Sequence, residues 1–269
     1  MVYYKTEEEV EKIRYSCQLV SKTLGVVGEY LKAGVTGKFI DKIAEEFLLD
    51  QKAKPAFKGY HGFPNTLCIS VNEVVVHGIP SDYAFRDGDI VSVDCGSFFD
   101  GFYGDAAYTF ALGNVKPETL ELCAVTLESL YKGISMAVVG NRLEDIGFAV
   151  QSYTERDHGY GVVRDLVGHG IGKNLHEEPQ VPNYGKRGRG MLLKDGLVIA
   201  IEPMINMGRR EVKQASDNWT ILTSDKKPSA HYEHTVVVRK NSADILSTHS
   251  FAEEAIKNNP ELIGIPKKN

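Results

Sequence analysis

The apolar positions near the start of the chain recur at helical spacing. Between residues 13 and 31 they alternate in steps of four and three, which predicts a helix with one buried face. Thr6 and Glu9 precede this run with the spacing of a capping box, in which a hydroxyl and a carboxylate each satisfy a free backbone N–H. Gly34 ends this helix, and Thr36 can cap a second one with apolar residues at 40, 43 and 47.

Strand-like sequence follows, and the same order then recurs. β-Branched and aromatic residues favour strands at 67–71, 74–76, 90–98 and 103–112. Pro117 suits the first turn of a third helix, and Asn141 with Glu144 can cap a fourth that runs through Tyr153. Further strand-like runs lie at 197–205, 212–222 and 231–238.

This order predicts an α+β fold with two pseudo-symmetric helix–helix–strand halves, about residues 1–115 and 116–250, around a central antiparallel sheet. An ordinary α+β chain without an internal repeat is the alternative, because the two halves are not obviously alike in sequence. No linker or low-complexity segment separates the halves, so we expect a single catalytic domain over residues 1–269.

One predicted strand pair carries acidic residues where a strand is expected to be apolar. Asp100-Gly101 between two strand-like runs is a strong signal for a two-residue hairpin turn. With this turn, Asp94 faces Ala107 and Gly96 faces Asp105. The two aspartates then become diagonal neighbours on one face of the sheet, about 7–8 Å apart at the backbone. Two carboxylates that close repel unless a cation or a shared proton lies between them.

Two glutamates lie in or beside apolar runs of the second half. Glu202 follows the run 197–201, and Glu233 precedes the run 235–238. A salt bridge or exposure at a strand end is an ordinary explanation for any one such acid. Four embedded carboxylates without Lys or Arg in the same runs are explained jointly by hard oxygen ligands around two divalent ions.

Three histidines lie in Gly- and Pro-rich turns. His169 is flanked by glycines, His176 follows shortly after, and His77 ends a strand-like run before Gly78. The glycines around His169 indicate a loop that brings backbone and imidazole close to a bound group. An isolated loop histidine is usually a surface residue, but three of them in a chain with four embedded carboxylates favour a site.

Composition and charge narrow the class of protein. A net charge of −5 makes nucleic acid an unexpected partner, and no apolar run approaches the ~18 residues of a membrane span. The N-terminus has no apolar signal stretch, and the four cysteines are far apart in the sequence. We therefore expect a cytoplasmic protein with free thiols.

Seven strings in the chain are similar to those of the type I methionine aminopeptidases of the short bacterial type, which have the pita-bread fold. The resemblance runs from about Thr6 to Val238 and agrees with the two-halved order of elements. The strings are G-Y-H-G-F-P at 59–64, V-V-V-H-G-I-P at 74–80, D-G-F-Y-G-D at 100–105, G-H-G-I-G at 168–172, H-E-E-P at 176–179, I-E-P-M at 201–204 and Y-E-H-T at 232–235.

The resemblance implies an enzyme that uses two divalent ions to remove N-terminal methionine when the second residue is small. Asp105 and Glu233 would bridge both ions, and Glu202 would also act as general base toward an activated water. His176 would stabilise the oxyanion, and His77 would hold the scissile amide nitrogen. The five implied metal ligands are Asp94, Asp105, His169, Glu202 and Glu233.

The resemblance also implies a substrate pocket and further partners. The pocket would be formed by Tyr60, Phe63, Cys68, His77, His176 and Trp219. Asn72, Val74 and Ser229 could surround a monovalent cation. The divalent ions could be Mn, Fe, Co or Zn, since oxygen and imidazole ligands suit all four. The implied partners are nascent polypeptides and the ribosome, contacted through the basic clusters 186–189 and 209–210, with the chain acting as a monomer.

Some positions depart from the familiar family pattern, and two rival functions follow from the same scaffold. Phe63, Leu175 and His231 stand where Tyr, Phe and Gln are familiar, and alternation places His231 on the side of Glu233, within reach of the metal rim. An Xaa-Pro hydrolase of the aminopeptidase P or prolidase type shares the five ligands. A non-catalytic binding protein on the same fold is the alternative from another class, and the intact ligand set disfavours it.

Overall fold

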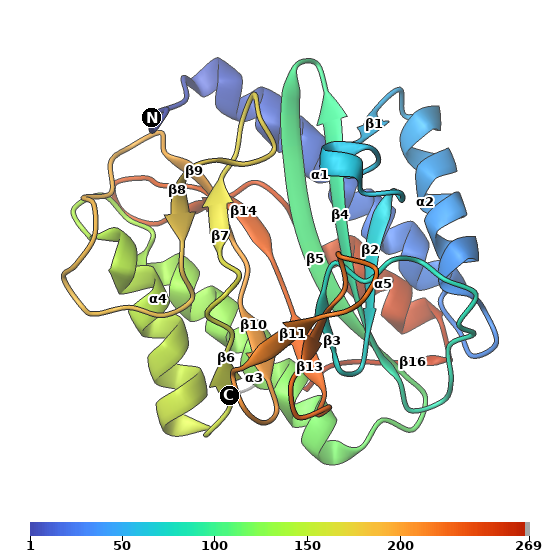
Figure 1. Ribbon diagram of the computed structural model, residues 1–269. Helices are drawn as coiled ribbons and strands as arrows, with labels where there is room; N and C mark the ends of the chain where they lie inside the picture. Colours follow the sequence, from blue (N-terminus) through green and yellow to red (C-terminus); the bar gives the residue numbers. More distant parts are fainter. Residues whose placement is uncertain (267–269) are drawn as a thin grey trace.

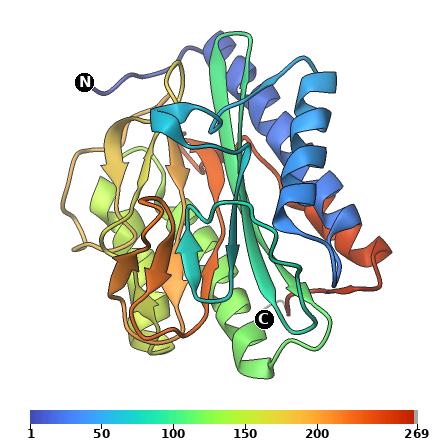
Figure 2. The ribbon, with the colours of Figure 1, turned by 45° about the vertical axis from the view of Figure 1, so that its right-hand side comes forward.

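The computed structural model describes residues 1–266 and has an α+β architecture. Helices α1, α2 and α5 lie on one side of the molecule and α3 and α4 on the other, with the strands between them (Figures 1 and 2). The helices are α1 (Glu7–Tyr30), α2 (Gly37–Asp50), α3 (Pro117–Met136), α4 (Leu143–Gln151) and α5 (Ser250–Asn258), with a 3-10 turn at Tyr60–Gly62 and a π-helical turn at Ser152–Asp157.

The predicted helix starts are confirmed for α1, α2 and α3. Thr6 and Glu9 form the capping box of α1, Thr36 caps α2, and Pro117 occupies the first turn of α3. The predicted cap of α4 is wrong by one residue: the Asp145 carboxylate accepts the backbone N–H of Arg142 at 2.8 Å. Asn141 Nδ2 instead donates to Met136 O and the Glu144 carboxylate accepts the Lys186 N–H, so these two residues do not cap α4.

The first half is built around the predicted hairpin. Strands β4 (Ile90–Phe99) and β5 (Phe102–Leu112) pair antiparallel with Asp94 opposite Ala107 and Gly96 opposite Asp105, which confirms the predicted register. The turn residues have positive φ, 47° at Asp100 and 84° at Gly101, as a two-residue turn of this kind requires. Flanking strands of this sheet are β1 (Lys54–Pro55), β2 (Leu67–Val71) and β16 (Leu262–Ile263).

The second half differs from the prediction, because each of its long strand-like runs is divided into two strands. The run 197–205 becomes β9 (Val198–Ile201) and β10 (Met204–Asn206), and the run 231–238 becomes β13 (Ser229–His231) and β14 (His234–Val237). Strands β9 and β14 pair in one sheet, and β10 and β13 pair in another. Each of the two runs therefore passes from one sheet to the other, and the two crossings lie side by side. Glu202 and Glu233 lie at these crossings.

The predicted central sheet is therefore divided into two five-stranded and two three-stranded antiparallel sheets in the described part of the chain. The run 212–222 forms a hairpin that pairs with β3. The remaining strands are β3 (Val74–Val76), β6 (Gly161–Val162), β7 (Gly168–Gly170), β8 (Glu177–Val181), β11 (Val212–Gln214), β12 (Ile221–Thr223) and β15 (Asp244–Ile245).

Strand β5 joins the two halves at the level of the site. Thr235 Oγ1 donates to the carbonyl oxygen of Asp105 at 2.8 Å, and the Glu233 N–H donates to Ala107 O at 3.0 Å. Thr109 Oγ1 donates to His231 O at 2.6 Å. These buried bonds fix the acidic residues of the first half relative to those of the second. The assignment of the chain to one domain stays a prediction, and its last three residues, 267–269, lie outside the described residues.

Among the described residues, no helix combines the length and apolar character that a membrane crossing needs. The inner faces of the helices pack against the sheets and form the core. Leu24, Tyr108 and Ile199 are fully or almost fully buried in one cluster of this core.

Gly104 is where α1 comes closest to β5, and this contact yields a stability prediction. A Cβ at Gly104 would lie 2.4 Å from Cys17 N and 2.5 Å from the carbonyl carbon of Ser16. Because backbone atoms cannot move aside cheaply, Gly104→Ala is expected to lower the free energy of unfolding by about 1–3 kcal/mol or more. Urea denaturation of Gly104→Ala beside Gly264→Ala, where the space is open, measures the difference. Equal stabilities would show that α1 is not packed against β5 in this way.

Candidate active site

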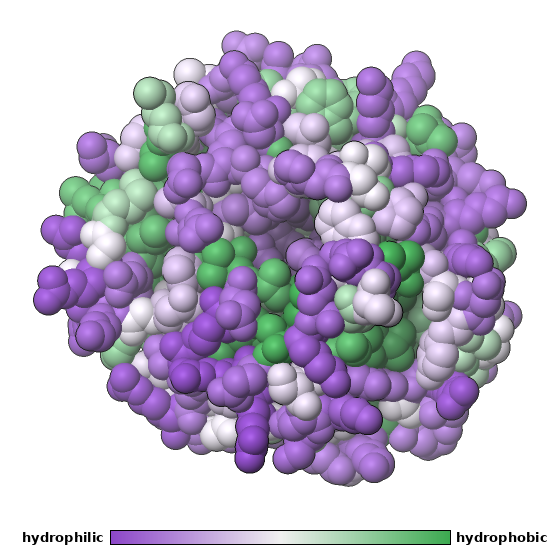
Figure 3. Space-filling model, in the orientation of Figure 1, coloured by the Kyte–Doolittle hydropathy of each residue, from purple (hydrophilic) through white to green (hydrophobic). Residues whose placement is uncertain are grey.

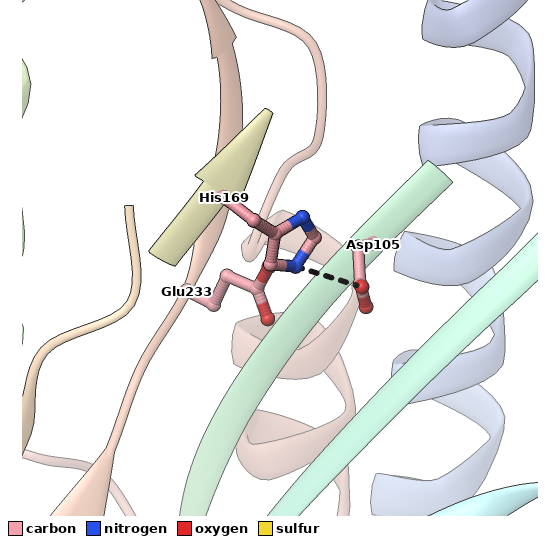
Figure 4. A group of neighbouring side chains, drawn as sticks. All are labelled: Asp105, His169 and Glu233. Atoms are coloured by element: carbon pink, nitrogen blue, oxygen red, sulfur yellow. Dashed lines mark ion pairs between the residues drawn. The ribbon is translucent and has the colours of Figure 1, made fainter. Parts of the chain in front are cut away.

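The five side chains predicted to hold metal ions line a single cavity of about 190 Å³. They belong to separate segments of both halves. The face of the molecule drawn in Figure 3 is hollowed near its centre. The ligand atoms of Asp105, His169 and Glu233 all lie within 4.8 Å of one another (Figure 4). Asp94 and Glu202 complete the acidic lining of this cavity.

His169 lies in the short strand β7 and not in the predicted loop. Its flanking glycines are needed because a Cβ at Gly168 would lie 2.3 Å from Ala200 O and one at Gly170 would lie 2.4 Å from Glu178 O. His169 Nδ1 donates to Gly170 O at 2.9 Å, so the lone pair is on Nε2. Nε2 points toward Asp105 Oδ2 at 3.8 Å and Glu202 Oε1 at 3.6 Å.

Burial raises the pKa of every carboxyl group in this cluster. Burial raises the pKa of Asp94 to about 7. It also raises the pKa values of Asp105, Glu202 and Glu233 well above their usual range, and the neighbouring carboxylates raise them further. Burial lowers the pKa of His169 to about 3, so this imidazole stays neutral and cannot balance the negative charge.

The residues of the cluster fit divalent cations. Asp94 Oδ1, Asp105 Oδ1 and Glu233 Oε1 are buried in the described structure without a hydrogen-bond partner. None of the described residues that line the cavity is lysine or arginine. Carboxylate oxygens and a neutral imidazole lone pair that face each other without donors form a ligand set for cations between them.

The predicted substrate-side residues form the other wall of the same cavity. Phe63 and Trp219 pack edge to face with ring centroids 5.2 Å apart, and Cys68 lies directly opposite Asp94 in the β2–β4 ladder. Burial raises the pKa of the Cys68 thiol well above its usual range, so this side chain is an uncharged, polarizable contact. The predicted pocket residues that line the cavity are Tyr60, Phe63, Cys68, His77, His176 and Trp219.

Two neutral histidines stand between the acidic and aromatic walls. Burial lowers the pKa of His176 to about 4, with a smaller contribution from His77, whose own pKa is lowered by burial. His176 Nδ1 lies 2.9 Å from the Tyr60 hydroxyl. A phenol that donates to Nδ1 leaves the proton of His176 on Nε2, available to an acceptor in the cavity. Sequence reasoning did not single out Phe57 and His61, which also line the cavity; His61 had a signal, since it lies in the string 59–64.

The three departures from the family pattern have different locations. Phe63 and Leu175 line the cavity, and Leu175 adds an aliphatic contact to the aromatic wall. His231 is buried behind Glu202, with Nε2 4.0 Å from Glu202 Oε2 and without a hydrogen-bond partner in the described structure. The expectation that His231 reaches the rim of the acidic cluster therefore agrees with the geometry.

A second cavity continues from the first and provides a path for a longer ligand. It has a volume of about 490 Å³ and shares with the first cavity His77, His169, His176 and Glu202. Asp165, Glu178 and Gln180 line its outer part.

Comparison with known proteins identifies the family of this chain. The family model of metallopeptidase family M24 matches residues 11–240, which include all five predicted ligands. The methionine aminopeptidase of Clostridium perfringens is 49% identical over 247 residues, covering 92% of this chain and 99% of that protein.

Solved structures show the same fold. The methionine aminopeptidase from Rickettsia prowazekii superimposes with a TM-score of 0.90 at 39% identity, covering 92% of this chain and 100% of that one. The prolidase from Pyrococcus horikoshii has a TM-score of 0.74 at 23% identity, covering 91% of this chain and 63% of that one, and shares the fold alone. The chain thus has the pita-bread architecture and belongs to metallopeptidase family M24, within its methionine aminopeptidase group.

Proposed function

We propose that this protein is a metal-dependent aminopeptidase that removes the N-terminal methionine of polypeptides whose second residue is small. One observation carries the proposal: a buried carboxylate–imidazole cluster and an aromatic-walled slot share one cavity. The first peptide bond of a substrate lies beside cations held by the cluster only when the first side chain of that substrate occupies the slot. Methionine fits such a slot because it is unbranched and makes favourable sulfur–aromatic contacts.

Two divalent ions held by the five ligands would supply Lewis-acid stabilisation and acidify the attacking water. Glu202 faces the cluster from its edge, where its carboxylate would accept a proton from the attacking water and return it to the leaving amine. Asn183 Nδ2 donates to the backbone carbonyl of Glu202 at 3.0 Å and so holds the base in place.

The neutral histidines handle the peptide bond itself. His176, with its proton on Nε2, donates to the developing oxyanion. Tyr60 orients that imidazole through the 2.9 Å contact at Nδ1. His77 lines both the first cavity and the groove formed by the second, where it would contact the scissile amide nitrogen. A bulky second residue would meet His77 and His176 at this junction, which explains the requirement for a small one.

The ions are proposed to be Mn, Fe, Co or Zn, two per chain, since oxygen and imidazole ligands suit all four. A monovalent cation near Asn72, Val74 and Ser229 is proposed on the adjacency of these residues: Ser229 N donates to Asn72 O at 2.8 Å. Nascent polypeptides are the proposed substrates, in the cytoplasm. The exposed basic residues Lys186 to Arg189 and Arg209-Arg210 are the proposed ribosome contacts of a monomeric enzyme.

A peptide panel that differs only in the first two residues tests the proposed substrate. Met-Ala-Ser is expected to be cleaved well, Met-Lys-Ser poorly, and Val-Ala-Ser and Ala-Ala-Ser essentially not at all. A first-position leucine is expected to be cleaved about 10–200-fold less well, because one misfitting methylene-sized group costs ~1–3 kcal/mol. Strong preference for proline at the second position, whatever precedes it, would establish the Xaa-Pro hydrolase alternative. A metal-loaded protein that cleaves none of the peptides would favour the binding-protein alternative.

Metal binding is expected to release protons near neutral pH. The carboxyl groups have raised pKa values, about 7 for Asp94, so the metal-free protein holds protons that the ions must displace. Metal affinity should therefore increase as the pH rises from 6 to 8, with fewer protons released at the higher pH. Calorimetric titration of chelator-treated protein with Mn²⁺ in buffers of different ionisation enthalpy measures this release. Absence of proton release at pH 6, or peptide hydrolysis by the metal-free protein, would contradict the assigned cluster.

Glu202→Gln tests the assigned base. The amide keeps the shape of the side chain but cannot accept the proton, so kcat is expected to decrease by about 10²–10⁴-fold while KM changes little. Glu211→Gln, an exposed glutamate that pairs with Arg210, is the matched control and should leave both constants unchanged. A Glu202→Gln enzyme within threefold of the parent kcat would mean that another group is the base.

A further inference from the structure

Glu233 lies at a break between strands, where its backbone lacks a regular ladder. Strand β13 ends at His231 and β14 begins at His234, so Tyr232 and Glu233 fall between two sheets. The Glu233 N–H donates to Ala107 O at 3.0 Å. The carbonyl of Glu233 requires another donor, because buried carbonyl groups are almost always paired.

That donor is a histidine from the C-terminal segment. His249 Nε2 lies 3.1 Å from Glu233 O and 3.1 Å from Ala107 O, and the residue is 3% exposed. Both partners are carbonyl oxygens, which only accept, so Nε2 must carry the proton. Nδ1 of His249 is buried and has no partner in the described structure. The imidazole is therefore committed to one task, which is to hold the backbone of Glu233 against that of β5.

The ring of His249 is fixed by its neighbours. It stacks on His234 with centroids 3.9 Å apart and meets Tyr108 edge to face at 4.9 Å. His234 Nδ1 lies 2.7 Å from Ser247 Oγ, which also accepts the Thr235 N–H at 3.3 Å. This network reaches from the C-terminal segment to the backbone on both sides of Glu233.

Helix α5 holds this network in place. It follows residue 240, where the match to the family model ends. His249 immediately precedes α5, and α5 packs closely on α1, where a Cβ at Gly28 would lie 2.8 Å from Ala255 Cβ. Asn259 Nδ2 donates to Gly28 O at 2.8 Å and to Leu31 O at 2.9 Å, which secures the end of α5. The position of His249 is thus set by contacts remote from the cavity.

We propose that His249 is a positioning residue of the metal centre: through its Nε2–H it sets where the Glu233 carboxylate stands relative to Asp105. The inference rests on the proposed assignment of Glu233 as a metal ligand. Groups that orient the ligands of a metal typically change its affinity 10–100-fold when they are removed. The C-terminal segment would in this way control metal binding without touching substrate.

The test measures Mn²⁺ affinity by calorimetry on the full-length, chelator-treated protein. His249→Phe keeps a ring in the stack but removes the donor, and its Mn²⁺ affinity is expected to decrease 10–100-fold. Thr248→Ala is the matched control in the same segment, because its hydroxyl bonds only to nearby Ser250. Peptide KM at saturating Mn²⁺ should stay within twofold of the parent value in both variants, since neither residue lines the substrate cavity.

A second pair of variants separates positioning from stability. The amide nitrogen of His249→Gln can occupy a position near that of Nε2, whereas the shorter His249→Asn cannot reach the two carbonyls. The Gln variant is expected to retain affinity near the parent value and the Asn variant to lose it. A folded His249→Phe with parent affinity overturns the proposal, and if that variant does not fold, equal affinities of the Gln and Asn variants overturn it. A parent protein that binds no Mn²⁺ would instead refute the metal assignment in the proposed function.

Discussion

Mutual repulsion among four carboxyl groups in one buried cavity is the constraint around which this protein is organised. Burial and neighbouring negative charge raise the pKa of Asp105, Glu202 and Glu233 well above their usual range. A cluster of this kind is stable only with protons or cations between its oxygens. The single imidazole of the cluster cannot help as a charge, because burial lowers the pKa of His169 to about 3. The fold must therefore impose the convergence through backbone contacts, and protons or cations must balance the charge.

The backbone contacts that impose it converge on β5. This strand carries Asp105 and, through Ala107 and Thr109, bonds to the segment that contains Glu233. The two glutamates of the second half lie where the chain crosses from one sheet to another, so their side chains leave the regular ladder and turn into the cavity. Strand breaks here are a functional feature, since an uninterrupted strand would fix these side chains in the alternation of a sheet face.

The cavity has one wall that is acidic and another that is apolar. Its acidic wall is polar and suited to cations, while Phe63 and Trp219 make the opposite wall apolar. Neutral His77 and His176 lie at the junction with the outer groove, where the peptide bond of a substrate would be placed. In the proposed function, the shape of this small cavity selects the first residue, and the acidic wall beside it holds the ions that the reaction needs.

The features of this protein that could be predicted from its sequence are those that depend on local interactions. Residue spacing predicted the capped helices, and Asp100-Gly101 predicted the β4–β5 register that makes neighbours of Asp94 and Asp105, because a two-residue turn fixes strand pairing. Long matching strings identified the family, and the resemblance implied five metal ligands that line one cavity in the structure. The strand breaks at Glu202 and Glu233, the strand β7 and the contact of His249 Nε2 with Glu233 O became visible in the folded chain alone. Those features depend on contacts between segments distant in the sequence, and no local pattern of residues encodes them.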